Sequence, residues 1–186
     1  MTQPGAMPSP SALPAAATVR RVRSLDALQA QGLAELLIDC VEGGASVSFM
    51  MPLSMAKSLA FWQGVGEGVA RGERALIVAE DASGIVGTVQ LVLAQPENQP
   101  HRADVSKMLV RRALRRQGLG EALMRAAEQA ARDSGKSLLV LDTASADAER
   151  LYARLGWQRF GTVPGFALLP GGGLCATTFF YRELAA

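Results

Sequence analysis

The stretch DVSKMLVRRALRRQGLGE, at Asp104–Glu121, decides the fold of this chain. Its first half, Asp104–Val110, mixes β-branched and long apolar residues and predicts a strand. A short basic turn with two glycines follows, and an amphipathic run over Glu121–Asp133 predicts a helix. A helix N-terminus has unpaired backbone N–H groups and partial positive charge, so it attracts phosphate. The turn at Arg115–Gly120, which we call the glycine turn, therefore predicts a pyrophosphate-binding loop.

Two common phosphate motifs do not fit the glycine turn. The Walker motif consists of a glycine, four further residues and then Gly-Lys-Ser/Thr, and no such run occurs in the sequence. The dinucleotide fingerprint needs three spaced glycines, but only Gly118 and Gly120 are present. The turn reads Arg-x-x-Gly-x-Gly, which resembles the acetyl-CoA loop of the GCN5-related N-acetyltransferase (GNAT) family. An ordinary strand-to-helix turn with solvated arginines is the alternative.

A second stretch, AERLYARLGW at residues 148–157, resembles another signature of the same family. It follows the glycine turn at the expected distance, and the resemblance then extends from about Val19 onward. The positions that match are Ala148, Leu151, Tyr152, Gly156 and the aromatic Trp157.

A narrower resemblance is to the acetyltransferases related to tabtoxin resistance protein, which acetylate a small toxin carrying an amine. Four stretches carry it: HRADVSK (101–107), LDT (141–143), VPGF (163–166) and TTFFY (177–181). The chain departs from that pattern near Ser145–Ala148, where it is one residue shorter, and around Leu174-Cys175. Ser145 stands where these relatives often carry Asn.

The whole-chain numbers restrict the class of protein. The chain has 186 residues, enough for one domain with its own core. A net charge of +2 argues against a general nucleic-acid surface, and no apolar run approaches a membrane span. Cys40 and Cys175 have no metal spacing, and the N-terminus lacks a signal peptide, which indicates a reduced cytoplasmic protein, with a chance disulfide left open. The single histidine, His101, excludes a multi-histidine metal site.

The remaining elements follow from periodicity and from turn residues. Met1–Thr18 is rich in Pro, Ala and Ser and predicts a flexible tail before a single domain over residues 19–186. Helices are expected from Leu25, with Ser24 as N-cap, at Ser54–Arg71 and at Ala146–Leu155. Strands are expected at Val19–Arg23, Arg74–Glu80, Ile85–Ala94, Leu138–Leu141 (buried on both faces), Trp157–Val163 and Leu174–Leu184.

This order predicts a mixed α/β (α+β) fold. It agrees with the GNAT acyl-CoA N-acyltransferase fold that the resemblance implies: a mostly antiparallel sheet, a central β-α-β unit and helices on both faces. Pro164–Gly173 is expected to be a loop that either caps the acceptor site or pairs with another subunit.

The resemblance implies acetyl-CoA as cosubstrate and no metal, because direct transfer to an amine requires none. It implies that the backbone of Leu109 and Val110 pairs with the pantetheine amides, and that Ser145 contacts the cofactor. The pyrophosphate is expected to bind the backbone N–H groups of Arg115, Arg116, Gln117, Gly118, Leu119 and Gly120. The neighbouring Arg111 and Arg112 are expected to be solvated.

Candidate catalytic residues come from the chemistry of amine acetylation. Tyr152 is the candidate general acid, which gives a proton to the leaving CoA thiolate; the alternative is a tyrosine of the core. A protonated amine cannot attack, so a base must accept its proton. Asp142 and Asp104 are the candidates, by resemblance to acidic positions near the acceptor site, with His101 as another possible base. The aromatic residues expected either in the acceptor pocket or in the core are Phe49, Trp62, Phe166, Phe179 and Tyr181.

The predicted function is an acetyl-CoA-dependent N-acetyltransferase of a small-molecule amine, acting by direct attack in a ternary complex. A non-catalytic acyl-CoA-binding or sensing module and a peptide or protein N-acetyltransferase are the alternatives. The predicted partner is the small-molecule amine, and binding to nucleic acid or to a membrane is not expected. Both a monomer and a homodimer are compatible with the sequence.

Overall fold

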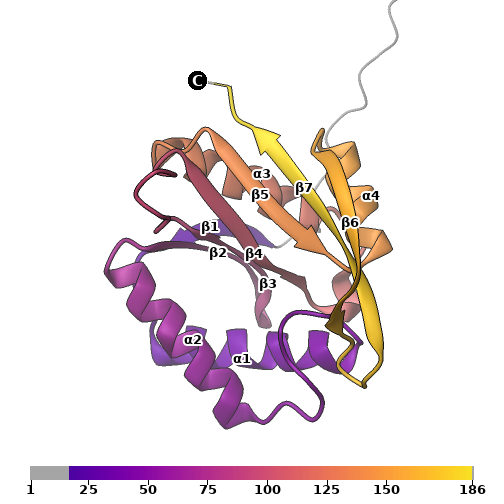
Figure 1. Cartoon of the computed structure of the whole chain (residues 1–186). Coiled ribbons are helices and arrows are strands. Elements are labelled where there is room, and N and C mark those ends of the chain that lie inside the picture. Colours follow the sequence, from indigo (N-terminus) through magenta and orange to yellow (C-terminus); the bar gives the residue numbers. More distant parts are fainter. Residues whose placement is uncertain (1–16, 186) are drawn as a thin grey trace, which may run out of the picture.

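A single mixed sheet runs through the computed structural model, which describes residues 17–185 (Figure 1). Its seven strands lie in the order β1-β2-β3-β4-β5-β7-β6. Within the described residues, β4 and β5 pair in parallel and all other neighbours are antiparallel. The mixed α/β prediction is confirmed. The predicted tail, Met1–Thr18, lies outside the described residues except at its end, where Thr18 already pairs with Glu80.

The element bounds stay close to the predicted ones except at a few ends. In chain order they are β1 (Thr18–Val22), α1 (Ala27–Glu42), α2 (Met55–Ala70), β2 (Arg74–Asp81), β3 (Gly84–Val92), β4 (Arg102–Val110), the short 3₁₀ helix η1 (Arg112–Leu114), α3 (Leu119–Asp133), β5 (Leu138–Thr143), α4 (Ala146–Arg154), β6 (Gln158–Leu168) and β7 (Leu174–Glu183).

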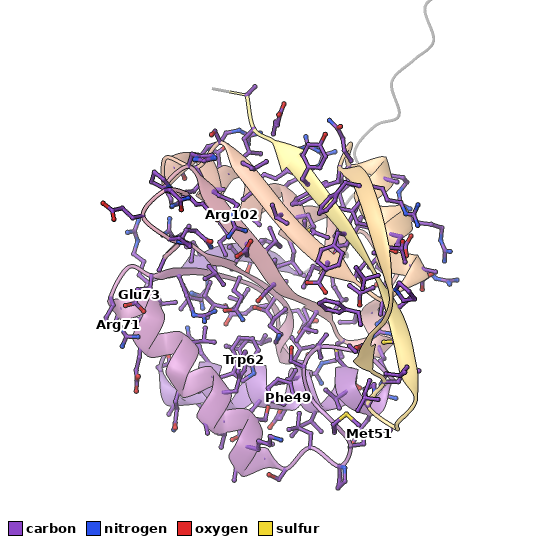
Figure 2. The ribbon with its side chains drawn as sticks, viewed as in Figure 1. Phe49, Met51, Trp62, Arg71, Glu73 and Arg102 are labelled. Atoms are coloured by element: carbon purple, nitrogen blue, oxygen red, sulfur yellow. The ribbon has the colours of Figure 1, made fainter. Side chains whose placement is uncertain are left out.

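Helices cover both faces of the sheet and divide the core in two. Helices α1 and α2 pack on one face around Trp62, which is fully buried. Figure 2 shows this side chain between α2 and the sheet. Helices α3 and α4 pack on the other face, where Leu123, Met124 and Tyr152 meet the sheet. Because successive strand residues point to opposite faces, each strand contributes alternate side chains to the two cores.

The start of α1 differs from the prediction. The N-cap is Asp26 rather than Ser24, because Asp26 accepts a hydrogen bond from the Gln29 backbone N–H at 2.8 Å. The Gln29 side chain accepts in return from the Asp26 N–H at 3.2 Å, which completes a capping box. Ser54 caps α2 by accepting from the Lys57 N–H at 3.2 Å.

The last hairpin is longer than predicted. Pro164–Gly173 is not wholly a loop, because β6 continues to Leu168, and Ala167 and Leu168 pair with Cys175 and Leu174. The pairing shifts between Val163 and Ala167. Strand β6 is an edge strand, where a proline that lacks an N–H is tolerated.

Strands β4 and β5 pair only briefly. Their parallel register covers Arg102–Asp104 against Leu138–Val140, after which β4 follows β3 and β5 follows β7. One extra residue of β4 lies between the pairs Thr88–Leu109 and Gln90–Ser106, and it bends this strand. The prediction that Leu138–Leu141 is buried on both faces is wrong, since Leu139 and Leu141 are buried but Leu138 and Val140, on the other face, are only partly buried.

Candidate active site

A large cleft of about 870 Å³ opens where β4 and β5 part. Its walls are β4 from Val105 to Val110, the glycine turn, the end of β5 from Leu141 to Thr143, and helix α4. The volume lies within the range of small-molecule sites, roughly 300–1,000 Å³. The parting of two strands thus gives the sheet a ligand-sized opening in its middle.

The glycine turn closes one end of the large cleft. Gly118 is the N-cap of α3 with φ +84°, a left-handed conformation that favours glycine, and no side chain caps this end of the helix. The first helical hydrogen bond runs from Ala122 N–H to Gly118 C=O, so the N–H groups of Leu119, Gly120 and Glu121 have no partner within the helix. A Cβ on Gly120 would lie 3.0 Å from Leu151 Cδ2, so a larger residue there would require the Leu151 side chain to shift. This is a suitable site for an anionic group such as pyrophosphate.

The side chains of the glycine turn point in different directions. Arg115 donates to the Val110 carbonyl at 3.3 Å, and Arg116 lies 3.6 Å from the carboxylate of Asp147; both arginines line the cleft. Gln117 donates instead to the Ala113 carbonyl at 3.4 Å. The Leu119 side chain is buried in the core. Gln117 and Leu119 therefore have only backbone groups to offer to a ligand.

Arg111 and Arg112 are not simply solvated, contrary to expectation. Arg112 donates from its backbone and its Nε to Asp39 of α1, at 2.9 and 2.8 Å. Arg111 donates to the Ile85 carbonyl at 3.1 Å. These contacts attach the segment before the glycine turn to α1 and β3, and so fix its position.

The free side of β4 forms another wall of the large cleft. Within the described residues, no strand pairs with this side of β4 beyond Asp104, so backbone groups there are open to an extended ligand. Leu109 buries its side chain against α1. The Val110 carbonyl already accepts contacts from Cys40 and Arg115. An extended chain with amide groups could pair with this wall in the way that a strand would.

Tyr152 lines the cleft from α4 with 4% of its surface exposed. Its ring packs on Trp157 and Phe180, with centroids 5.9 and 5.7 Å away. Burial, aided by the charge of Asp142, raises the pKa of Tyr152 above its usual value, so the phenol keeps its proton. Ser145 also lines the cleft, and its hydroxyl caps α4 by accepting from the Ala148 N–H at 3.4 Å.

A small cavity of about 240 Å³ adjoins the large cleft and shares Asp142 with it. Phe49 and Phe166 line this small cavity, whereas Phe179 and Tyr181 line neither space. Figure 2 shows Phe49 below the sheet, on the side of α1 and α2. The Met51 N–H donates to the Pro170 carbonyl at 2.9 Å, which joins the α1–α2 loop to the β6–β7 turn beside the cavity.

Asp142 is the carboxylate that both spaces reach. Burial raises the pKa of Asp142, the cation of Lys107 opposes that rise, and the charge of Asp104 adds to it. Asp104 is engaged elsewhere: it forms an ion pair with Arg102 and accepts from Gln95 at 3.1 Å. His101 lies in the turn before β4 and lines neither space.

Lys107 is a candidate site residue that the sequence analysis missed. Its ammonium donates to the Ser48 hydroxyl at 3.2 Å and lies 5.6 Å from the ring centroid of Phe61. Burial lowers the pKa of Lys107, Asp142 opposes the shift and Arg74 adds to it. The direction of the Lys107 side chain depends on the bulge in β4, where the backbone φ of Lys107 is +52°. The periodicity of a sequence cannot show such a bulge.

Comparison with known proteins identifies the part of the chain that forms the large cleft. Residues 72–159 match the family model described as "Acetyltransferase (GNAT) domain". This part of the chain is therefore similar to the acetyltransferase domain of the GNAT family. The matched GNAT segment contains β4, the glycine turn, β5 and Tyr152, but it does not contain Ser48, Phe49 or Phe166 of the small cavity.

Solved structures share the GNAT fold over nearly the whole chain. YncA of Salmonella typhimurium, with its cofactor acetyl-CoA, is 20% identical with a TM-score of 0.74, over 91% of this chain and 95% of its own. A phosphinothricin acetyltransferase of Sinorhizobium meliloti in complex with AcCoA is 19% identical with a TM-score of 0.74, over 91% and 89%. A ribosomal-protein-alanine N-acetyltransferase of Brucella melitensis is 20% identical with a TM-score of 0.73, over 90% and 99%.

Two further expectations concern metal and membrane. Across residues 17–185, no three His, Cys, Asp or Glu side chains gather in a way that could hold a metal ion. No helix in the same range is long and apolar enough to span a membrane. The absence of a metal from the reaction stays a prediction.

Proposed function

We propose that this chain is an acetyl-CoA-dependent N-acetyltransferase that acts on a small-molecule amine. One observation carries the proposal: a single continuous cleft has the uncapped N-terminus of α3 at one end and Asp142, shared with the small cavity, at the other. The large cleft suits the nucleotide and pantetheine, and the small cavity suits the acceptor. Bound acetyl-CoA would supply the acetyl thioester.

Asp142 is the proposed base. Its carboxylate faces the small cavity and has no ion-pair partner within 4.0 Å among the described residues, so it is free to accept the proton of the amine. Asp104 is a weaker candidate, because Arg102 and Gln95 already occupy its oxygens. Burial raises the pKa of Asp142 toward the working range of a general base.

Tyr152 is the proposed acid. Its hydroxyl has no hydrogen-bond partner among the described residues, although the side chain lines the cleft. A phenol that stays protonated can give its proton to the sulfur that leaves as the amide bond forms. Backbone N–H groups on the free side of β4 are the proposed donors to the carbonyl oxygen under attack.

Direct transfer is favoured over an acetyl-enzyme. Burial raises the pKa of Cys40, which disfavours the thiolate that a nucleophile requires. Cys175 lines neither space. We expect a Cys40→Ala, Cys175→Ala double variant to keep its turnover, and a folded double variant without turnover would contradict direct transfer.

The sequence left two alternatives to this function: a peptide or protein acceptor, and a sensor that acetylates nothing. The sequence resemblance to tabtoxin resistance protein favours a small toxin-like amine, whereas the Brucella structural neighbour acts, by its name, on a ribosomal protein. The small volume of the cavity, about 240 Å³, favours a small amine over a peptide. A non-catalytic acyl-CoA sensor is the other alternative, and the presence of both Tyr152 and Asp142 disfavours it. A cytoplasmic location and a monomeric or homodimeric state stay predictions.

The experiment is a free-thiol release assay with acetyl-CoA and a panel of amines: amino acids, polyamines, aminoglycosides and short peptides. We expect turnover on one small-molecule class, with large losses in Tyr152→Phe and Asp142→Asn. Tight binding of acetyl-CoA without turnover on any amine would support the sensor. Absence of CoA binding would refute the proposed function as a whole.

A further inference from the structure

Two opposite charges at the acceptor end, Lys107 and Asp142, have no ion-pair partner among the described residues. Arg102 and Asp104 neutralise each other in an ion pair. Asp142 and Lys107 also lie near each other, but their charged atoms are more than 4.0 Å apart, since no ion pair joins them. Arg74 adds a further cation near Lys107, and it bonds the neutral amide of Gln90 at 2.7 Å. Arg74 itself lies near the carboxylate of Glu73, so among the described residues Lys107 and Asp142 are the charges at this end that no ion-pair partner within 4.0 Å neutralises.

Lys107 is held in place without a carboxylate. Its side chain is half-buried, and its ammonium donates to the Ser48 hydroxyl and packs over Phe61 of α2. A neutral hydroxyl and an aromatic face replace only part of the hydration that an ammonium loses on burial. A ligand that brings a negative group beside Lys107 would supply the missing charge.

The backbone around this contact is unusual. Ser48 has φ +75° and Lys107 has φ +52°, and both conformations are disfavoured for side chains with a Cβ. Together with Arg116 they are the non-glycine residues with positive φ in the described chain, and each of the three lines one of the two spaces. Strained residues gather where a binding site requires a fixed geometry.

We propose that the acceptor is a zwitterion, an amine that carries a carboxylate or similar anionic group close by, and that Lys107 with Ser48 binds this anionic group while Asp142 faces the amine. This inference rests on the proposed transferase function. The two opposite charges, separated by more than 4.0 Å and open to the same space, match an amino-acid-like molecule. The aromatic wall of Phe49 and Phe166 would contact its side chain.

A simpler role for Lys107 is to influence the charge of Asp142. The two roles give different results in a test with matched ligands. Removal of Lys107 should move the acid limb of the pH profile in both cases, because its charge lowers the pKa of Asp142. If Lys107 acts only through Asp142, its removal weakens the acetylation of acidic and neutral acceptors alike. If Lys107 binds the anionic group, its removal weakens the acidic acceptor selectively.

The test compares wild type with Lys107→Met on matched acceptors: L-methionine, L-phenylalanine and L-glutamate, their carboxamides, and 2-aminoethylphosphonate. We expect wild type to prefer an acid over its amide, and Lys107→Met to lose on the order of 30-fold in kcat/KM for the acid. The amide should change by less than about 3-fold, and Lys107→Arg should restore part of the preference. Lys57→Met is the control, because Lys57 lies over the Phe49 ring but lines neither space.

A binding measurement accompanies the kinetics. Each acid and its amide are titrated calorimetrically into the protein saturated with CoA, and we expect tighter binding of the acid in wild type only. Equal losses for acid and amide in Lys107→Met, or an unchanged preference, would overturn the inference. CoA binding with acetylation of polyamines or neutral amides alone would overturn it while leaving the transferase function intact. Failure of wild type to bind CoA would instead refute the proposed function.

Discussion

Burial acts on Tyr152 and Asp142 in the same direction but with different chemical results. It raises the pKa of both groups. The phenol thus keeps a proton to donate, and the carboxylate becomes a stronger proton acceptor near neutral pH. In the proposed mechanism, Tyr152 is the acid that protonates the leaving thiolate and Asp142 is the base that accepts the proton of the amine.

The residue that gives the clearest test is Tyr152. We expect Tyr152→Phe to lower kcat by about 100-fold, since general acid catalysis contributes factors of this size. The free energy of unfolding should change by less than about 1 kcal/mol, because the hydroxyl loses no hydrogen-bond partner. Thiol-release kinetics and urea denaturation measure the two effects. Unchanged kcat would show that the tyrosine only packs in the core.

The pH profile reports on Asp142. The carboxylate must be ionised to accept a proton, so kcat/KM falls as pH drops through its pKa. Since burial raises that pKa, the acid limb should lie above the ordinary aspartate value of about 3.9. Lys107 lowers the same pKa, so Lys107→Met should move the limb to higher pH.

The matched variant for this profile is Asp142→Asn, which we expect to lose about 100-fold or more in kcat and to show no acid limb. Rates are measured from about pH 4 to about pH 9, a range that brackets the ordinary pKa of a carboxylate. Survival of the acid limb in Asp142→Asn would assign the base to another group, with Asp104 the first to examine.

Sequence patterns predicted the positions of some of these site residues but not of others. Tyr152 and the glycine turn lie in contiguous motifs, so their positions follow from the sequence. Lys107 depends on a bulge in β4, which no period-2 pattern predicts. The pairing of Asp104 with Arg102 could have been anticipated, because residues two apart in a strand share a face.

At the scale of elements, the start of α3 is the feature that ties fold to function. The helix begins at Leu119, directly after Gly118 in a left-handed conformation, and its free N–H groups face the cleft. The arginines before it are attached to α1 and β3, which holds the turn in position.

We expect Gly118→Ala to weaken CoA binding by about 10-fold or more, because a Cβ at φ +84° disturbs the conformation that aligns these N–H groups. The strain should also cost about 1–2 kcal/mol of stability. Gly84→Ala is the matched control: its φ is +106°, it lies at the β2–β3 turn, and it should lose stability without losing CoA affinity. Equal CoA affinity in the two variants would mean that the turn does not bind the cofactor.

The end of β6 shows how an element can escape prediction. Pro164 and Gly165 suggest a loop, yet the strand continues past them to Leu168. Edge strands tolerate both residues, and whether a strand lies at an edge is a property of the whole sheet. The turn residues in the sequence therefore predicted an end for β6, at Val163, that comes too early.

At the scale of the molecule, a buried polar contact joins α3 to the C-terminal strands. Glu128, 5% exposed, accepts from the Trp157 indole at 3.1 Å and pairs with Arg182 of β7 at 3.3 Å. One further guanidinium nitrogen of Arg182 is buried without a partner. The Glu128 carboxylate is thus the contact that neutralises this half-buried cation.

Removal of Glu128 should destabilise the whole fold. Glu128→Leu leaves Arg182 charged, half-buried and unpaired, and it removes the acceptor of the Trp157 indole N–H, which together cost about 3 kcal/mol. Glu67→Leu is the control, since Glu67 forms an exposed pair with Arg71 at 3.8 Å and such pairs contribute under about 1 kcal/mol. Urea denaturation of both variants checks the difference, and similar midpoints would contradict a structural role for Glu128.

The sequence predicted the proposed cofactor half of the site but not the proposed acceptor half. The cofactor half lies within residues 72–159, where motifs and the family match agree. The acceptor half is assembled from the α1–α2 loop and the β6–β7 hairpin, which meet through Met51 and Pro170 and are far apart in the chain. Such a surface has no contiguous motif, so only the folded structure reveals it.

The most direct test of the central claim is hydrogen exchange of wild-type protein with and without saturating acetyl-CoA. The claim is that the cofactor lies between the parted strands β4 and β5 and against the start of α3. We expect slower exchange in peptides that cover residues 105–121 and 141–145, with little change in β1 and β2, which do not line the cleft. No protection at all, or protection confined to other elements, would contradict it.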